Sequence, residues 1–236
     1  MARISNKMYF RRRLSLSTAI VLPMFIAFSS DALAQCVSSA GTVSVPANGA
    51  TVTCYAGQTS TTQIGDGTTS ATVNLQDNHI LNPPAASAEG IYLQNATVTL
   101  GNGAEISSSK IGIAEHGASA ITLDVGAEIN AGTVGIQNSP GNSQKVTLTL
   151  GSSAKITAGT FGVRAKYTDI SMQSGAQISG TNGGVLFSYA PPKTITLAAG
   201  AEISSTGGDA ISAPNGTLKL TNAGLVSAFQ RGGFGR

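Results

Sequence analysis

Aliphatic residues return along most of this chain at a nearly constant interval. Six of them can serve as anchors of a repeat: Ile106, Ile129, Ile156, Ile178, Ile203 and Val226. The intervals between them are 23, 27, 22, 25 and 23 residues, within the range that is typical of solenoid proteins. The pattern therefore predicts a stack of similar coils.

Each anchor is preceded by two apolar residues that flank a polar one, an alternation that predicts a short, half-buried strand. The apolar pairs are Val98 and Leu100, Ile121 and Leu123, Leu148 and Leu150, Ile170 and Met172, Ile195 and Leu197, and Leu218 and Leu220. Three positions before the anchor stands a small residue that suits a tight bend. These residues are Gly103, Gly126, Ser153, Gly175, Gly200 and Ala223.

A second apolar step follows each anchor after seven or eight residues. It falls on Ile113, Ile136, Val163, Val185, Ile211 and, in the last coil, Phe234, and Gly or Ala precedes each of them. One coil of this kind cannot bury its own apolar residues, so successive coils must stack like residues on like residues. We therefore predict an all-β fold, a right-handed parallel β-helix with about six coils of 22–27 residues over residues 71–236. A propeller or sandwich would need longer strands or would lack this register.

The coils differ in length mainly between the second apolar step and the next strand. Insertions thus gather at one corner, where repeat proteins often place their binding residues. The loop over residues 186–193 contains Phe187, Tyr189 and Lys193. Exposed aromatic residues beside a polar rim can mark an interaction site, so we predict a ligand-binding loop here. Alternatively, these side chains fold back and seal the corner.

The first 34 residues have the three zones of a secretory signal peptide. A basic segment ends at Arg13, an apolar segment covers residues 14–28, and Ala32-Leu33-Ala34 fits a signal peptidase site. The apolar segment is shorter than the roughly 20 residues that a membrane span needs. We predict cleavage after Ala34, export across the inner membrane, and no membrane span after cleavage.

Removal of residues 1–34 changes the charge balance. The whole chain has 14 Lys plus Arg and 11 Asp plus Glu, but five of these cations and one anion lie in the first 34 residues. The mature chain thus carries nine cations and ten anions, which argues against a nucleic-acid partner.

The two cysteines of the chain, Cys36 and Cys54, follow the predicted cleavage site closely. In an exported protein such a pair most simply forms a disulfide, and we predict a disulfide-containing cap over residues 35–70. The alternative is a redox or metal-binding thiol pair, but the spacing matches no such motif and we expect no histidine nearby. The two histidines, His79 and His116, fall in different coils, so we predict no metal or cofactor site.

One row of side chains could suit catalysis. The residues directly before the anchors are Glu105, Glu128, Lys155, Gln177 and Glu202. Glu105 and Glu128 should be neighbours about 5 Å apart, which resembles the carboxylate pair of a retaining glycosidase. A solvated row in which Lys155 offsets Glu128 explains the same residues, so we expect no catalytic residue. A secreted polysaccharide lyase or hydrolase is the alternative.

The signal, the Cys pair, the Gly-Ala-x-Ile-Ser blocks and the Gly-Ile steps together resemble the passenger domain of bacterial autotransporters. The resemblance covers about residues 71–236. It implies a non-enzymatic adhesin or virulence-associated scaffold at the outer membrane or cell surface, or outside the cell, with a host-surface or extracellular-matrix ligand.

The sequence lacks the C-terminal β-barrel translocator of that family. We therefore expect a truncated passenger, which would stay in the periplasm if no translocator is supplied. A gene fragment without independent function is the other interpretation. We also expect residues 220–236 to fray, or to mediate self-association through an open last coil, since a solenoid end exposes unpaired strand backbone.

Overall fold

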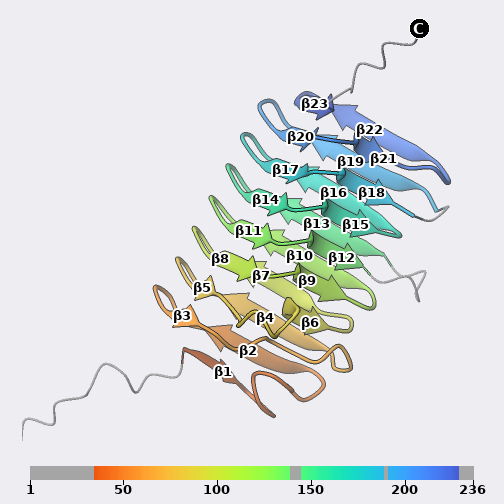
Figure 1. The fold of residues 1–236 in the computed structure, drawn as a ribbon. Helices are drawn as coiled ribbons and strands as arrows, with labels where there is room; N and C mark the ends of the chain where they lie inside the picture. The colour runs from red at the N-terminus through yellow and green to blue at the C-terminus, as the bar shows by residue number, and fades with distance from the viewer. Residues whose placement is uncertain (1–34, 139–144, 189–190, 229–236) are drawn as a thin grey trace, which may run out of the picture. The chain divides into compact units, whose positions relative to one another are not determined.

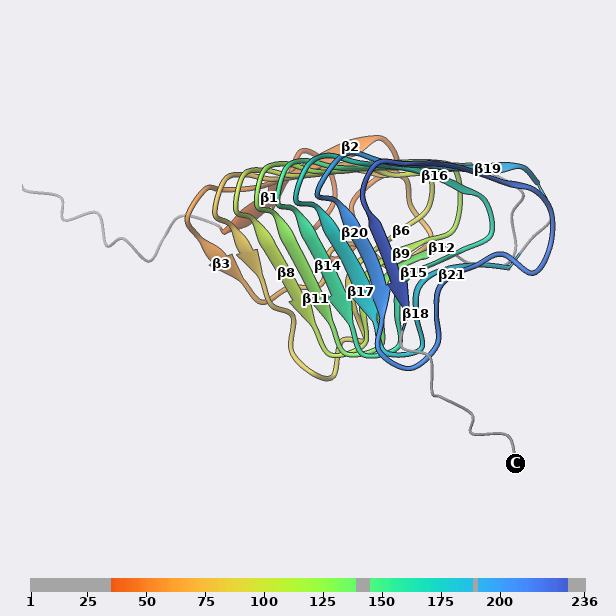
Figure 2. The ribbon, with the colours of Figure 1, turned by 90° about the horizontal axis from the view of Figure 1, so that it is seen from above.

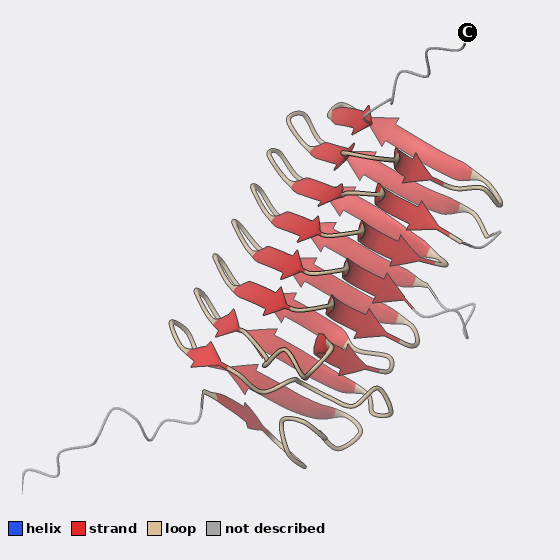
Figure 3. Cartoon of the chain, viewed as in Figure 1, coloured by secondary structure: helices blue, strands red, loops and turns tan. Residues whose placement is uncertain are grey.

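Short strands separated by bends follow one another along the whole described chain, as the alternation of apolar and polar residues predicts. A computed structural model describes residues 35–138, 145–188 and 191–228 as a β-solenoid of about seven turns (Figure 1). Figure 3 shows strands and loops in this part of the chain and no helix. The prediction of an all-β parallel β-helix is thus confirmed, and the stack is consistent with the right-handed form. Within the described ranges, no helix is long and apolar enough to cross a membrane.

Three sheets run along the stack. Sheet 1 contains β1 (Cys36–Ser38), β2 (Ala50–Cys54), β4 (Ala71–Leu75), β7 (Thr97–Leu100), β10 (Ser119–Leu123), β13 (Val146–Leu150), β16 (Thr168–Met172), β19 (Lys193–Leu197) and β22 (Leu218–Asn222). Sheet 2 contains β3 (Thr59–Ser60), β5 (Ile80–Leu81), β8 (Glu105–Ser108), β11 (Glu128–Ala131), β14 (Lys155–Ala158), β17 (Gln177–Gly180), β20 (Glu202–Ser205) and β23 (Leu225–Ala228). Sheet 3 contains β6 (Glu89–Leu93), β9 (Ile111–Glu115), β12 (Val134–Asn138), β15 (Phe161–Ala165), β18 (Gly183–Phe187) and β21 (Asp209–Ser212).

The anchors form one continuous column inside the stack. Ile129 pairs in register with Ile106 on one side and with Ile156 on the other, and the column continues through Ile178. These four side chains are fully buried. The second apolar step forms a parallel column in sheet 3, in which Ile136 pairs with Ile113 and Val163. The core is therefore built from like residues stacked between coils, and its predicted register is confirmed there.

Five of the six predicted bend residues have the backbone conformation that a tight bend requires. Their φ angles are 63°, 66°, 59°, 73° and 78° at Gly103, Gly126, Ser153, Gly175 and Gly200. The last coil departs from the prediction, because Ile195 pairs with Leu220 and Lys193 pairs with Leu218. Only Ala223 and Gly224 separate β22 from β23, so this coil has a shorter bend and its first strand is shifted by two residues.

Parallel stacking begins earlier than the anchors indicate. Strand β2 pairs in parallel with β4, and β3 pairs in parallel with β5, so residues 35–70 already contain a first coil. The antiparallel strand β1 lies on the outer edge of β2 and covers the start of sheet 1. The anchor place of this coil is taken by Ser60, which pairs with Leu81. Because this position holds a polar residue, the repeat of aliphatic residues does not reveal this coil.

The small residue before the second apolar step is required by close packing between sheets 2 and 3. A Cβ atom on Gly135 would lie 2.3 Å from Cγ2 of Ile156 and 2.4 Å from the carbonyl oxygen of Gly162. Both distances are far below ordinary van der Waals contact. The Gly-Ile steps of the sequence therefore mark the place where the anchor column touches the next sheet.

Candidate functional site

A groove lined by hydroxyl groups follows the edge where sheet 2 turns into sheet 3. It consists of two hollows of about 390 and 150 Å³, which share Thr157 and Ala158 as lining residues. The lining also includes Ser108, Asn130, Ala131, Gly132, Gly159, Ser179, Gly180, Thr181, Ser204, Ser205 and Thr206. We call these residues the hydroxyl groove. Figure 2 shows strands β8, β11, β14, β17 and β20, which carry most of them, side by side.

Each coil adds one polar side chain to this groove because the residue after each anchor points out of sheet 2. Asn130, Thr157 and Ser179 occupy that place in consecutive coils and pair in register. The hydroxyl oxygens of Thr157 and Ser179 lie 3.5 Å apart. Since coils repeat about every 4.8 Å, the groove presents a regular row of hydrogen-bonding groups. Such a row can bind an extended polar ligand, and its lining has neither a charge nor an aromatic ring.

The carboxylate row lies on the outer face of the same sheet. Glu105 and Glu128 pair in register, as predicted. The Nζ atom of Lys155 lies 3.4 Å from Oε1 of Glu128, so the predicted offset of this carboxylate is confirmed. Asn130 donates a hydrogen bond of 3.2 Å from Nδ2 to Oε1 of Glu105. Both carboxylates thus have local polar partners on a partly solvated face.

Two of the three residues of the predicted ligand-binding loop are buried rather than exposed. Phe187 is 0% exposed and Lys193 is 1% exposed, while Tyr189 lies outside the described residues. The Nζ atom of Lys193 donates a 2.8 Å hydrogen bond to the carbonyl oxygen of Asn215 and lies 5.6 Å from the centroid of the Phe187 ring. Both side chains take inward positions of strands β18 and β19, so they seal the corner, which is the alternative that the sequence left open.

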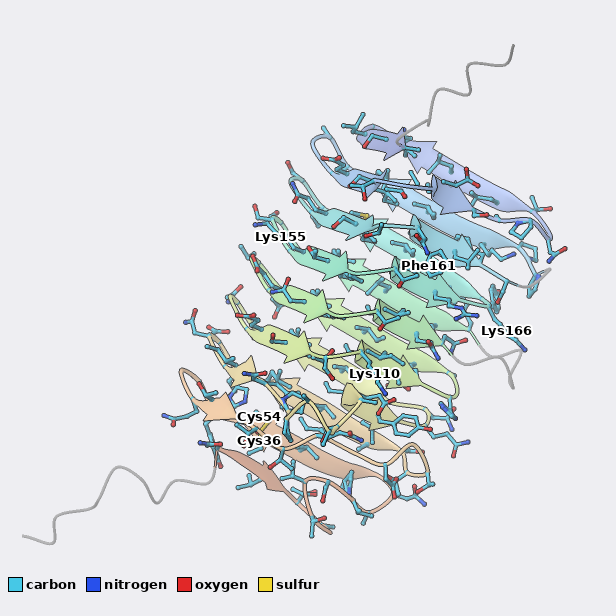
Figure 4. All side chains as sticks on the ribbon, in the orientation of Figure 1. Cys36, Cys54, Lys110, Lys155, Phe161 and Lys166 are labelled. Carbon is cyan, nitrogen blue, oxygen red and sulfur yellow. A yellow bond between two sulfur atoms is a disulfide. The ribbon has the colours of Figure 1, made fainter. Side chains whose placement is uncertain are left out.

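A cationic pocket was not found from the sequence. It has a volume of about 310 Å³ and is lined by Gln137, Asn138, Arg164, Lys166 and Ser188. Gln137 and Arg164 pair in register on the outer face of sheet 3, and Lys166 follows directly after β15 (Figure 4). The pocket lies at the corner where coil lengths vary. In the sequence, the only indication of this pocket is that two cations, Arg164 and Lys166, flank Ala165.

A buried polar cluster lies inside the same corner. Glu115 and Asn138 pair in register at inward positions of β9 and β12, and Ser119 Oγ donates a 2.7 Å hydrogen bond to Oε2 of Glu115. Glu115 is 0% exposed, and burial raises its pKa to about 7 against the weaker opposite effect of the Ser119 hydrogen bond. Among the described residues, Oε1 of Glu115 and Oδ1 of Asn138 have no hydrogen-bond partner. Burial of the carboxyl and the missing partner of its Oε1 atom favour a protonated Glu115.

The two cysteines form the expected disulfide, with Cys36 opposite Cys54 in the β1–β2 pair (Figure 4). The expectation that no histidine is near them is wrong. Nε2 of His79 lies 3.7 Å from Sγ of Cys36, although 43 residues separate the two in sequence. Nδ1 of His79 lies 2.8 Å from the carbonyl oxygen of Tyr55. Stacking of the first two coils brings the histidine to the disulfide, and spacing along the chain cannot show this.

Comparison of the chain with protein-family models, with curated proteins and with solved structures finds no match. The fold and the groove therefore define this protein structurally as a parallel β-helix with a row of hydroxyl groups along one edge.

Proposed function

We propose that this chain is an exported, non-enzymatic β-helical scaffold of the autotransporter-passenger type. In this proposal it acts as an adhesin at the bacterial surface, and the hydroxyl groove holds an extended, uncharged polar ligand of the host surface or extracellular matrix. The single observation that carries the proposal is the groove itself, because its polar groups repeat in register from coil to coil.

The physical basis is a match between a rigid repeat and a repeating ligand. Each groove-lining strand is held by hydrogen bonds to the strands of the coils before and after it, so the hydroxyl groups need little ordering when a ligand binds. A polysaccharide presents hydroxyl groups at regular intervals and both donates and accepts hydrogen bonds, as Ser and Thr do. A single contact of this type is weak, so affinity depends on several coils acting together.

The Ser179→Tyr variant is expected to lose at least about tenfold in affinity for such a ligand, since the ring fills the groove and 1.4 kcal/mol of lost contacts already gives this factor. The matched control is Ser171→Tyr on the outer face of β16, which is in sheet 1 and away from the groove. Binding to a panel of neutral oligosaccharides and to immobilised extracellular-matrix glycoproteins is measured for both variants and the unchanged chain.

Equal binding by the two variants would reject the groove as the binding site. The same oligosaccharide panel separates the alternative function, a carbohydrate-active enzyme that uses the neighbouring Glu105 and Glu128. Release of new reducing ends during incubation would favour that enzyme over a pure binding scaffold.

Cleavage of the proposed signal peptide can be tested separately. We expect the chain recovered outside the inner membrane of an exporting cell to begin at Gln35, because the peptidase pattern ends at Ala34. N-terminal sequencing checks this, and mass spectrometry with and without reductant checks the bond between Cys36 and Cys54. Exported protein that retains Met1 would contradict export by a cleaved signal.

A further inference from the structure

The disulfide at the start of the solenoid has a third chemical group directed at it. Cys36 and Cys54 face each other across the antiparallel pair β1–β2, and His79 reaches them from the bend between β4 and β5. The two Sγ atoms and one ring nitrogen all lie within 4.8 Å of one another. Cys54 and His79 are 0% exposed, whereas Cys36 is half-buried.

The ring of His79 is held in one tautomer. Its Nδ1 atom lies 2.8 Å from the carbonyl oxygen of Tyr55, and a carbonyl can only accept a hydrogen bond, so Nδ1 carries the proton. In the neutral ring Nε2 then bears the lone pair, and this atom is the one 3.7 Å from Sγ of Cys36. Burial lowers the pKa of His79, which favours the neutral ring. A backbone carbonyl that fixes the far nitrogen is a usual partner of a metal-binding histidine.

We propose that Sγ of Cys36, Sγ of Cys54 and Nε2 of His79 form a Zn²⁺ site in the reduced protein. A tetrahedral zinc site with bonds of about 2.3 Å to sulfur and about 2.0 Å to nitrogen places its S and N ligands about 3.5 Å apart and its S ligands about 3.8 Å apart. The observed distance of 3.7 Å between Nε2 and Sγ of Cys36 already fits. Nε2 of His79 also lies within 4.8 Å of Sγ of Cys54. Metal binding requires the two sulfur atoms to separate, and the half-buried side of Cys36 leaves the fourth position to water.

The disulfide and the zinc site exclude each other, and the conversion between them balances. A dithiol reductant gives two electrons and two protons to the Cys36–Cys54 bond, which becomes two thiols while the reductant becomes a disulfide. Zn²⁺ then replaces the two thiol protons, which are released to water. His79 contributes its lone pair with no change in protonation. This step rests on the export proposed above, in which the chain enters an oxidising compartment with both thiols reduced, so zinc and oxidation compete for the same sulfur atoms.

The test uses the full chain in its oxidised and anaerobically reduced forms, titrated with Zn²⁺ and with Co²⁺ as a spectroscopic reporter. We expect the reduced form to bind one equivalent and to show thiolate-to-cobalt charge-transfer bands with tetrahedral d–d bands, and the oxidised form to show neither. The His79→Gln variant should bind at least about tenfold more weakly, as even the loss of an outer-shell partner has this effect. His116→Gln is the matched control and should bind as the unchanged chain does.

Circular dichroism accompanies each titration. The reduced chain or the His79→Gln variant could lose the circular-dichroism signal of its β-strands. In that case the proposal requires that Zn²⁺ restores this signal in the reduced unchanged chain. The Cys36→Ser variant then replaces His79→Gln as the ligand variant. The Cys36→Ser variant must then lose part of the thiolate-to-cobalt charge-transfer intensity and bind the metal at least about tenfold more weakly. Absence of binding by the reduced chain, no restoration by Zn²⁺, or unchanged affinity in the ligand variant would each overturn the proposal. Unchanged affinity in the His79→Gln variant would show that the two thiols bind the metal adventitiously, without the histidine.

Discussion

The Ile156→Asp variant is expected to lose roughly 4 kcal/mol or more of folding stability, which is the largest effect of any single change considered for this protein. Ile156 is fully buried and lies between Ile129 and Ile178 in the anchor column. A carboxylate there has no cation within the column, so it either stays charged at a high desolvation cost or takes up a proton. Both outcomes also remove the apolar contact with the neighbouring coils.

The matched control is Lys155→Ser, one residue earlier in the same strand. The side chain of Lys155 is 46% exposed, and its ion pair with Glu128 is solvated, so its loss should cost less than about 1 kcal/mol. Urea denaturation followed by circular dichroism measures both variants. Similar shifts in the urea midpoint of the two variants would contradict the placement of Ile156 on the inward face and Lys155 on the outward face of β14.

The second large effect concerns pH and Glu115. Its pKa rises from 4.5 to about 7 on folding, because the buried carboxyl favours the protonated form. The folded chain therefore binds more protons than the unfolded chain between these two values, and stability falls as pH rises through this window. Below about pH 4.5 this group carries no penalty, and above about pH 7 the penalty is complete. A shift of this size corresponds to roughly 3 kcal/mol.

The Glu115→Gln variant removes this ionisation and keeps the shape of the side chain. We expect it to be more stable than the unchanged chain at pH 8, by up to about 3 kcal/mol, and nearly equal to it at pH 4.5. Its amide oxygen can still accept the hydrogen bond from Ser119. Thermal denaturation at several pH values between 4.5 and 8 is the measurement.

The control for this prediction is Glu105→Gln, because Glu105 lies on the outer face of sheet 2 and is partly exposed. Its stability is measured at the same pH values, which shows whether a change in pH dependence is specific to Glu115. A Glu115→Gln variant with the same pH dependence as the unchanged chain would mean that Glu115 stays ionised inside the fold.

The repeat in the sequence was enough to predict the architecture of this protein. A parallel β-helix places residues of equal role above one another, so its register appears directly as a period in the aliphatic residues. The anchor column from Ile106 to Val226 and the bends at Gly103 and Gly126 follow from this rule. Prediction became weaker at the two ends, where Ser60 interrupts the aliphatic pattern and where the bend before β23 is shorter.

The direction of individual side chains at the variable corner was decided by the tertiary structure alone. The sequence placed Phe187 and Lys193 in an exposed loop and gave no indication for Glu115, yet all three side chains point into the interior. A loop of variable length resets the strand alternation, so the sequence does not show which residue of the next strand faces inward. Lys193 is tolerated there because its Nζ atom donates a hydrogen bond to the carbonyl oxygen of Asn215 in the adjacent coil.

The sequence by itself determined the fold class, the position of the core columns and the pairing of Cys36 with Cys54, since each depends on local period or on the only available partner. The tertiary structure decided which distant residues share a site. The hydroxyl groove joins side chains from successive coils, and His79 reaches the disulfide from another coil. The physical reason is that coils stack about 4.8 Å apart, so residues more than 20 positions apart in sequence become nearest neighbours in space.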